Sequence, residues 1–154
     1  MNVAKILQSE AVKSVSAISS KKRLFQELGD LASQAYGLKS AEVATALQER
    51  ESLGPTGVGH GVALPHARMQ GLDHVCGLFI QIEKPLDFDA VDKKPVDLIF
   101  ALLAPEDAGV EHLKALAVVS RSMRDSDLCS KLRANSDVAT LHTILAEQRR
   151  TQAA

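Results

Sequence analysis

The sequence predicts one α/β domain in which helices flank a mixed sheet, and three observations carry this prediction. The runs Val75–Ile82 and Val96–Leu103 are apolar on both alternating sets of side chains, which is typical of strands covered on both faces of a sheet. Apolar residues at helical spacing come before and after these runs, so helices and strands interleave. With 154 residues and 45% hydrophobic content, the chain is expected to form a single domain over 1–154, with its core at about 3–148.

The N-terminal part predicts short elements followed by a long helix. Residues 3–17 alternate small apolar and polar side chains weakly, and are expected to hold one or two short strands or turns. A helix is expected from Ser20 to Gly37, because a serine, Ser19 or Ser20, can cap its start and the glycine can end it. The residues that recur at helical spacing are Leu24, Phe25, Leu28, Leu31, Ala32 and Ala35.

A second helix is expected from Ser40, its predicted cap, to about Leu53, where Gly54 and Pro55 stop it. Arg50 would then lie in its last turn. The residues that share the apolar face of this helix are Val43, Ala46 and Leu47.

The most distinctive stretch follows this helix and is bounded by Arg50 and Arg68. It holds four of the nine glycines of the chain within eight residues, so its backbone is expected to form a loop that turns N–H groups toward a bound anion. A short apolar run, 62–64, comes next, and Pro65 favours extended geometry just before His66. His66 is therefore expected at the mouth of the loop. The glycines are Gly54, Gly57, Gly59 and Gly61.

The two long strands are expected to be joined by a loop over 83–95, which Phe88 anchors to the core. A helix is expected over Val110–Arg124, with His112 in its first turn. The residues along one side of it are Leu113, Leu116, Ala117, Ser120 and Met123.

Two shorter helices complete the prediction. One is expected from Ser126 to about Ala134, and one is capped by Ser136. The second is expected to bury Val138, Leu141 and Leu145. A frayed tail is expected over 149–154.

Charge and cysteine usage exclude several classes of protein. With 18 basic and 19 acidic residues the net charge is −1, so we expect neither nucleic acid nor an anionic membrane surface as partner. No segment is long and apolar enough for a membrane span, and no basic and apolar leader begins the chain. Cys76 and Cys129 stand far apart, which favours a reducing compartment. These observations predict a cytoplasmic protein.

Common phosphate, metal and hydrolase motifs do not fit the sequence. Gly54–Gly59 has the spacing of a Walker loop, but His60 stands where lysine belongs and no strand precedes it. The glycines do not match a dinucleotide fingerprint, and a GXXG turn would need a basic surface that this chain lacks. The five histidines show no zinc-type spacing, and no nucleophile elbow is present. We therefore expect no metal and no cofactor.

A histidine that is itself the reactive group fits best. Neutral imidazole is a competent nucleophile near pH 7, and a phosphoryl group on it needs N–H donors and a guanidinium around its oxygens. The glycine stretch and Arg50 can supply both to His66. The glycines can equally make a tight connection between helix and strand, and His112 can equally be a packing or capping residue, so both alternatives stay open.

The chain resembles the fructose/mannitol-type enzyme IIA domains of the bacterial phosphoenolpyruvate-dependent phosphotransferase system, and most closely the free-standing nitrogen-regulatory members. The resemblance covers nearly the whole chain. The matching blocks are Arg50–Gly59 with Gly61–Arg68, then Lys84–Asp92, Pro95–Pro105 and His112–Ser120.

The resemblance implies a fold with a mixed five-stranded sheet flanked by helices, and a phosphotransfer role. His66 would be phosphorylated on Nε2 by a phosphocarrier protein of the HPr type, with His112 as the second histidine of the site and Arg50 attending the phosphoryl group. Thr56 would lie in the same pocket, and we assign the glycine amides to phosphate binding with it. The predicted phosphate-binding residues are Thr56, Gly57, Gly59 and Gly61.

Two residues depart from the pattern of the nitrogen-regulatory members. Pro55 stands where serine is common, which removes an N–H donor, and His60 replaces a small or amide residue. Three hypotheses stay open: a phosphocarrier whose state is read by regulatory target proteins, a sugar-specific enzyme IIA that passes phosphate to a IIB domain, and an interaction module without chemistry. The retained His66, His112 and Arg50 argue against the last.

Overall fold

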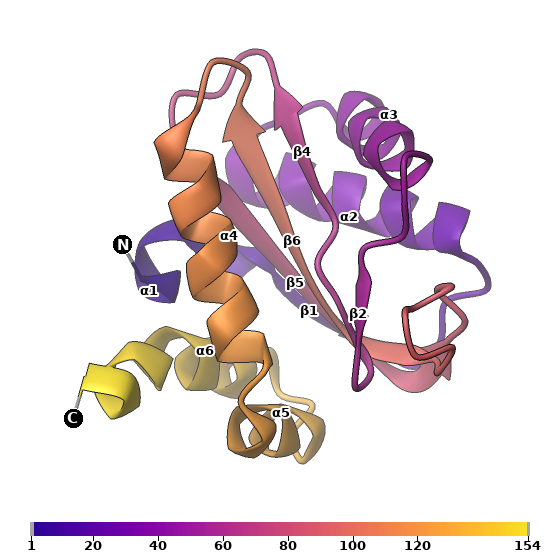
Figure 1. Ribbon diagram of the computed structural model, residues 1–154, viewed down its shortest axis with the longest axis vertical. Helices are drawn as coiled ribbons and strands as arrows, with labels where there is room; N and C mark the ends of the chain where they lie inside the picture. The colour runs from indigo at the N-terminus through magenta and orange to yellow at the C-terminus, as the bar shows by residue number, and fades with distance from the viewer. Residues whose placement is uncertain (1, 154) are drawn as a thin grey trace.

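A computed structural model describes the backbone of residues 2–153 and the side chains of residues 2–147. Five of the strands follow one another in the middle of the chain, with helices before and after them, and Figure 1 shows the helices arranged around one sheet. In chain order the elements are α1 (Val3–Ile6), a short 3-10 helix (Ser9–Ala11), β1 (Val12–Val15), α2 (Lys21–Tyr36), α3 (Ser40–Glu51), β2 (Gly57–Gly59), β3 (Val62–Ala63), β4 (His66–Met69), β5 (Cys76–Leu86), β6 (Val96–Pro105), α4 (Val110–Met123), α5 (Ser126–Arg133) and α6 (Val138–Ala153).

The sheet is mixed, which confirms the predicted fold class. Its order is β1-β5-β6-β3-β2, with β4 also pairing with β6, so that six strands form it in the described residues. β5 and β6 are antiparallel, whereas β1 runs parallel to β5 and both β3 and β4 run parallel to β6. β3 and β4 follow the same edge of β6 and are separated by Leu64 and Pro65, because proline has no N–H to give to the ladder.

The central strands β5 and β6 are buried on both faces, as predicted. β5 extends beyond Ile82 to Leu86, because the chain continues to pair across a bulge and Leu86 lies opposite Val96. The loop that follows is anchored by Phe88, which is fully buried and packs edge-on against Phe25 at a centroid distance of 6.2 Å. The predicted anchor is therefore confirmed, but the loop, 87–95, is shorter than the predicted 83–95.

The long helix α2 has the predicted ends. The Ser20 side chain accepts from the Arg23 N–H at its start, and Gly37 ends it with φ of 70°. The predicted cap of α3 is wrong, since Ser40 is already the first residue of the helix and its hydroxyl donates to Asp30 at 2.6 Å. In Figure 1, α2 lies behind the sheet and α4 crosses in front of it.

Helix α4 is formed as predicted, but of the five residues that the sequence aligns along one side only Met123 is buried. Leu113 is 63% exposed, whereas His112 is only 6% exposed. Two stripes of this helix have helical spacing, and the more polar one is the buried one. The residues of the buried stripe are His112, Ala115, Val119, Ser122 and Met123.

The two ends of the chain differ in part from the sequence prediction. The N-terminal segment holds α1 and a 3-10 helix before its single strand β1. At the C-terminus, Asp137 rather than Ser136 accepts from the Thr140 N–H at the start of α6. Leu141 and Leu145 are buried as predicted, but Val138 is 38% exposed.

The expected frayed tail at 149–154 lies within α6 as far as Ala153, and Ala154 is outside the described residues. Among the helices that the structure describes, none is both long enough and apolar enough to cross a membrane.

Candidate functional site

The ring of His66 is held in one tautomer by its own chain segment. His66 is the first residue of β4, and its Nδ1 lies 3.0 Å from the carbonyl oxygen of Leu64. A carbonyl oxygen only accepts, so Nδ1 carries the proton and Nε2 keeps its lone pair. Pro65 sets this geometry, because it keeps Leu64 extended while its own carbonyl accepts from the Leu102 N–H at 2.9 Å. The half-buried His66 therefore presents Nε2 as a nucleophile.

The second histidine lies beside the first. The ring centroids of His66 and His112 are 5.6 Å apart, and the rings are tilted by 48°. His112 is buried, and its Nδ1 has no hydrogen-bond partner among the described residues. Burial is the main cause that lowers the pKa of His112, and electrostatic interactions with the neighbouring His66 and Arg68 lower it further. The sequence could place His112 on a helix, but only the tertiary structure brings it to His66.

Of the two arginines at the ends of the glycine stretch, Arg68 acts electrostatically on His112, whereas the hydrogen bond of Arg50 goes to the loop after its own helix. Arg50 lies in the last turn of α3, as predicted, and its Nη1 donates to the Gly54 carbonyl oxygen at 3.1 Å. Arg68 lies two residues after His66 on β4, so both side chains emerge on the same side of that strand. Sequence reasoning used Arg68 only as the end of the glycine stretch. The alternation of β4 is the signal that could have identified it as a site residue.

The glycine stretch forms a hairpin rather than the predicted loop. β2 and β3 are antiparallel and are joined by His60 and Gly61, whose φ angles of 58° and 79° suit a tight hairpin turn. Several of its backbone groups are already bonded within the protein: the His60 N–H donates to Asp92, and the Gly61 carbonyl accepts from Asp97 and Leu98.

The hairpin points away from the histidine pair. Gly61 bonds to β6 at Leu98, whereas His66 lies opposite Leu102. Four residues of strand separate these levels, which is about 13 Å. The structure therefore does not bring Gly59 and Gly61 to the imidazole. Gly57 has another reason to be glycine, because a Cβ there would lie 2.8 Å from the Cβ of Ala90.

Thr56 is hydrogen-bonded to Leu64, the residue whose carbonyl oxygen contacts His66, and both hydrogen-bond donors of Thr56 are in use. Its hydroxyl donates to Glu51 Oε1 at 2.5 Å, and its N–H donates to Glu51 Oε2 at 3.0 Å. Its carbonyl oxygen accepts from the Leu64 N–H at 3.0 Å. Sequence reasoning missed Glu51. The signal was its position on the apolar stripe of α3, four residues after Leu47 and eight after Val43.

The other three histidines lie elsewhere. His60 is at the hairpin tip, His74 is exposed with its Nδ1 against Asp73, and His142 bonds through Nε2 to the Leu7 carbonyl oxygen. Within the described part of the chain, no three histidine, cysteine or acidic side chains are grouped closely enough to hold a metal ion.

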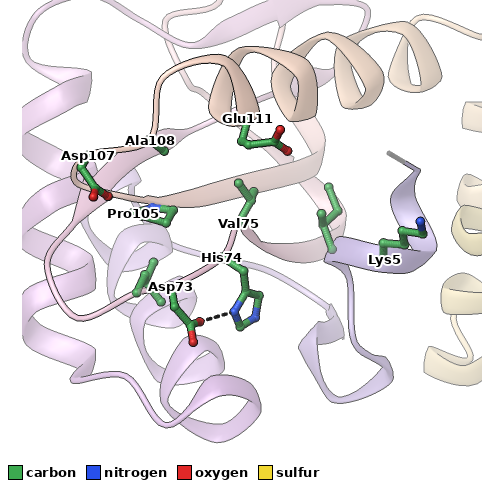
Figure 2. Close-up of a pocket in the computed structure, with 10 residues that line it drawn as sticks. Lys5, Asp73, His74, Val75, Pro105, Asp107, Ala108 and Glu111 are labelled. Carbon is green, nitrogen blue, oxygen red and sulfur yellow. Dashed lines mark hydrogen bonds and ion pairs between the residues drawn. The ribbon is translucent and has the colours of Figure 1, made fainter.

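A hollow of about 820 Å³, whose lining residues are drawn in Figure 2, does not include the histidine pair. Lys5, His74 and Glu111 line it, together with apolar groups such as Val75 and Pro105. Neither His66 nor His112 lines it. The histidine pair instead lies beside Val110 and Leu113 of α4, which are each 63% exposed. Exposed apolar side chains of this kind suit contact with a protein better than an enclosed small molecule.

Comparison with known proteins identifies close relatives of the whole chain. The family model described as "Phosphoenolpyruvate-dependent sugar phosphotransferase system, EIIA 2" matches residues 5–148. A nitrogen regulatory protein of Bradyrhizobium diazoefficiens is 42% identical over 146 residues, which is 95% of each chain. A fructose-specific EIIA component of the phosphotransferase system from Haloferax volcanii is 35% identical over 130 residues, 84% of each chain.

Solved structures agree with this result. The crystal structure of the nitrogen regulatory protein IIA-Ntr from Neisseria meningitidis superposes with a TM-score of 0.85 at 39% identity, covering 93% of this chain and 98% of that one. The crystal structure of IIA mannitol from Escherichia coli has the same fold, with a TM-score of 0.74 at 20% identity over 90% of this chain and 98% of that one.

Proposed function

The chain belongs to the EIIA 2 family of the phosphoenolpyruvate-dependent sugar phosphotransferase system, and we propose that it is a phosphohistidine carrier that accepts a phosphoryl group on Nε2 of His66. The observation that carries this proposal is the hydrogen bond from His66 Nδ1 to the Leu64 carbonyl oxygen, which leaves Nε2 as the free nucleophile. The donor would be a phosphorylated HPr-type phosphocarrier protein in the cytoplasm.

The transfer is an exchange of one P–N bond for another. The Nε2 lone pair of His66 forms a bond to phosphorus while the P–N bond of the donor breaks, and that electron pair returns to the donor nitrogen. The Nδ1 proton stays on His66 and remains bonded to Leu64. When phosphate is passed on, His66 therefore leaves as a neutral imidazole, which favours departure.

The neighbouring groups support this exchange. His112 has a lowered pKa and is neutral near pH 7, so it does not hold a second positive charge against the nucleophile. Its Nδ1 has no hydrogen-bond partner among the described residues. The guanidinium group of Arg68, which acts electrostatically on His112, supplies positive charge for the incoming phosphoryl oxygens. For Arg50 the same role rests on the family resemblance, since its Nη1 donates to the Gly54 carbonyl oxygen. Thr56 serves this site through its backbone, since both its donors are bonded to Glu51.

We place the carrier in regulation rather than sugar uptake. The relative that is 42% identical is named a nitrogen regulatory protein, and the 39% identical structure carries a similar name. Phosphorylation adds close to two negative charges at neutral pH, so a target protein can distinguish the two forms. The alternative, a sugar-specific enzyme IIA that passes phosphate to a IIB domain, is favoured by the fructose-specific relative at 35% identity.

Phosphate labelling tests the carrier. Incubation with a phosphorylated HPr-type donor should place one acid-labile, base-stable phosphate on the wild-type protein. His66→Ala should take up none, whereas His74→Ala, which alters an exposed histidine outside the site, should be labelled normally. Full labelling of His66→Ala would contradict the proposal.

A second measurement separates the two roles. The phosphorylated protein is presented to IIB domains, and transfer of the label is followed with time. We expect little transfer from a regulatory carrier. Rapid and complete transfer to a IIB domain would favour sugar uptake instead.

A further inference from the structure

Glu51 is a buried carboxylate next to the site. It is the last residue of α3 and only 9% exposed. Its Oε1 accepts from the Thr56 hydroxyl, and its Oε2 accepts from the Thr56 N–H and lies 2.8 Å from Lys21 Nζ. A carboxylate is costly to bury unless its oxygens are paired in this way. Two of the three contacts fix a single residue, Thr56.

Thr56 is connected to His66 by an unbroken series of hydrogen bonds. The Thr56 carbonyl oxygen accepts from the Leu64 N–H at 3.0 Å, and the Leu64 carbonyl oxygen accepts from His66 Nδ1 at 3.0 Å. The first bond orients the backbone of Leu64, and the second uses that orientation to hold the imidazole. Displacement of Thr56 would therefore move the group that selects the His66 tautomer.

At the Glu51 end of this series, the ion pair with Lys21 is connected to the core. Lys21 is the first residue of α2, and its Nζ lies 4.5 Å from the centre of the Phe88 ring. Phe88 is fully buried against Phe25. The charge of Glu51 is thus balanced by a cation whose own position is set by core packing, which makes Glu51 a rigid support.

We infer that Glu51 is a positioning residue for phosphoryl acceptance: through Thr56 and Leu64 it holds His66 with the proton on Nδ1 and the lone pair on Nε2. This inference rests on the proposed function of His66 as acceptor. Only the tautomer with a free Nε2 can form the new P–N bond, so the rate of transfer follows the population of that tautomer.

Three variants test the inference. Glu51→Gln replaces one acceptor oxygen by an amide that faces donors, Thr56→Val removes the hydroxyl at nearly constant shape, and Thr56→Ser keeps it. In the unphosphorylated proteins, the nitrogen-15 chemical shifts of the His66 ring report the tautomer. Transfer rates are measured with a phosphorylated HPr-type donor.

We expect Glu51→Gln to shift His66 toward mixed tautomers and to slow transfer roughly tenfold, which corresponds to about 1.4 kcal/mol in the barrier. Thr56→Val should change both readouts in the same direction but less. Thr56→Ser should restore the wild-type ring shifts and most of the rate. Wild-type shifts and rates in both Glu51→Gln and Thr56→Val would overturn the inference.

Asp97→Asn is the matched control for a purely structural effect. Asp97 makes a comparable carboxylate pair with Arg133 but lies five residues before Leu102 on β6, away from His66. It should lower stability and leave the His66 shifts unchanged. If it slows transfer and changes the shifts as Glu51→Gln does, the role of Glu51 is structural only. If the wild-type protein takes up no label, the proposed function fails, while the ring shifts still decide the role of Glu51.

Discussion

The chemistry of His66 depends on a carbonyl oxygen two residues earlier in the chain. Because the Leu64 carbonyl accepts from Nδ1, the ring nitrogen that keeps its lone pair is Nε2. The sequence shows that a proline follows Leu64 and favours extended backbone. It does not show which ring nitrogen is bonded, because that depends on a side-chain rotation fixed by surrounding atoms.

At this scale we predict a pH dependence that arises from His112. A histidine in the unfolded chain titrates near its ordinary pKa of 6.5, whereas burial lowers the pKa of His112 in the folded protein. Below about pH 6.5 the unfolded state therefore binds the proton first, so stability falls as the pH decreases until the folded-state pKa is also passed. Each unit of lowering costs about 1.4 kcal/mol.

Urea unfolding at pH 7.5 and at lower pH measures this effect. His112→Gln should lose the part of the pH dependence that belongs to His112, whereas His74→Gln, at an exposed position, should keep it. An unchanged pH profile in His112→Gln would contradict the prediction.

The β2–β3 hairpin is the element whose prediction changed most. Its glycines predicted an anion-binding loop, but the same flexibility permits a tight turn, and strand pairing with β6 decided between the two. Glycine at the turn is required for two separate reasons. Gly61 has φ of 79°, and a Cβ there would lie 2.5 Å from Arg133 Nη2.

The two reasons can be separated with a second glycine. Gly71 has a similar φ of 85°, but nothing lies within 4 Å of its Cβ position. Gly71→Ala should cost only the backbone strain, about 1 kcal/mol. Gly61→Ala should cost about 2–3 kcal/mol, because the Arg133–Asp97 pair must also move. The free energy of unfolding in urea measures both, and equal costs would show that the contact with Arg133 is unimportant.

At the scale of the whole molecule, the fold brings reactive and apolar groups to one end of β6. His66 lies opposite Leu102, near the end of that strand, and α4 begins just after it with His112 in its first turn. The exposed Val110 and Leu113 lie in the same turns. This arrangement gives a donor protein an apolar surface beside the acceptor nitrogen.

We therefore predict that Leu113→Gln weakens docking of the donor. Its kcat/KM for phosphoryl transfer should fall roughly tenfold, mainly through KM, which corresponds to about 1.4 kcal/mol. Val91→Gln is the matched control, since Val91 is 80% exposed but lies in the loop at the other end of β6. Initial rates at several donor concentrations measure both. Equal effects of the two variants would show that α4 is not the docking surface.

Much of the architecture could be predicted from residue patterns, because local periodicity records which side of an element is buried. The strands β5 and β6 and the anchor Phe88 follow from the apolar pattern, and the ends of α2 follow from its capping serine and terminal glycine. The buried side of α4 could not be predicted this way. Its more polar stripe is buried because the sheet brings His66 against it, and hydrophobicity alone favours the other stripe.

The sequence by itself determined the fold class, the family resemblance and the choice of His66, since these depend on residue types at fixed spacing. Only the tertiary structure decided the pairing of His66 with His112, the route from Glu51 to Leu64, and the exclusion of Gly59 and Gly61 from the site. The physical reason is that these relations join residues through strand register and helix packing, which depend on contacts between distant parts of the chain.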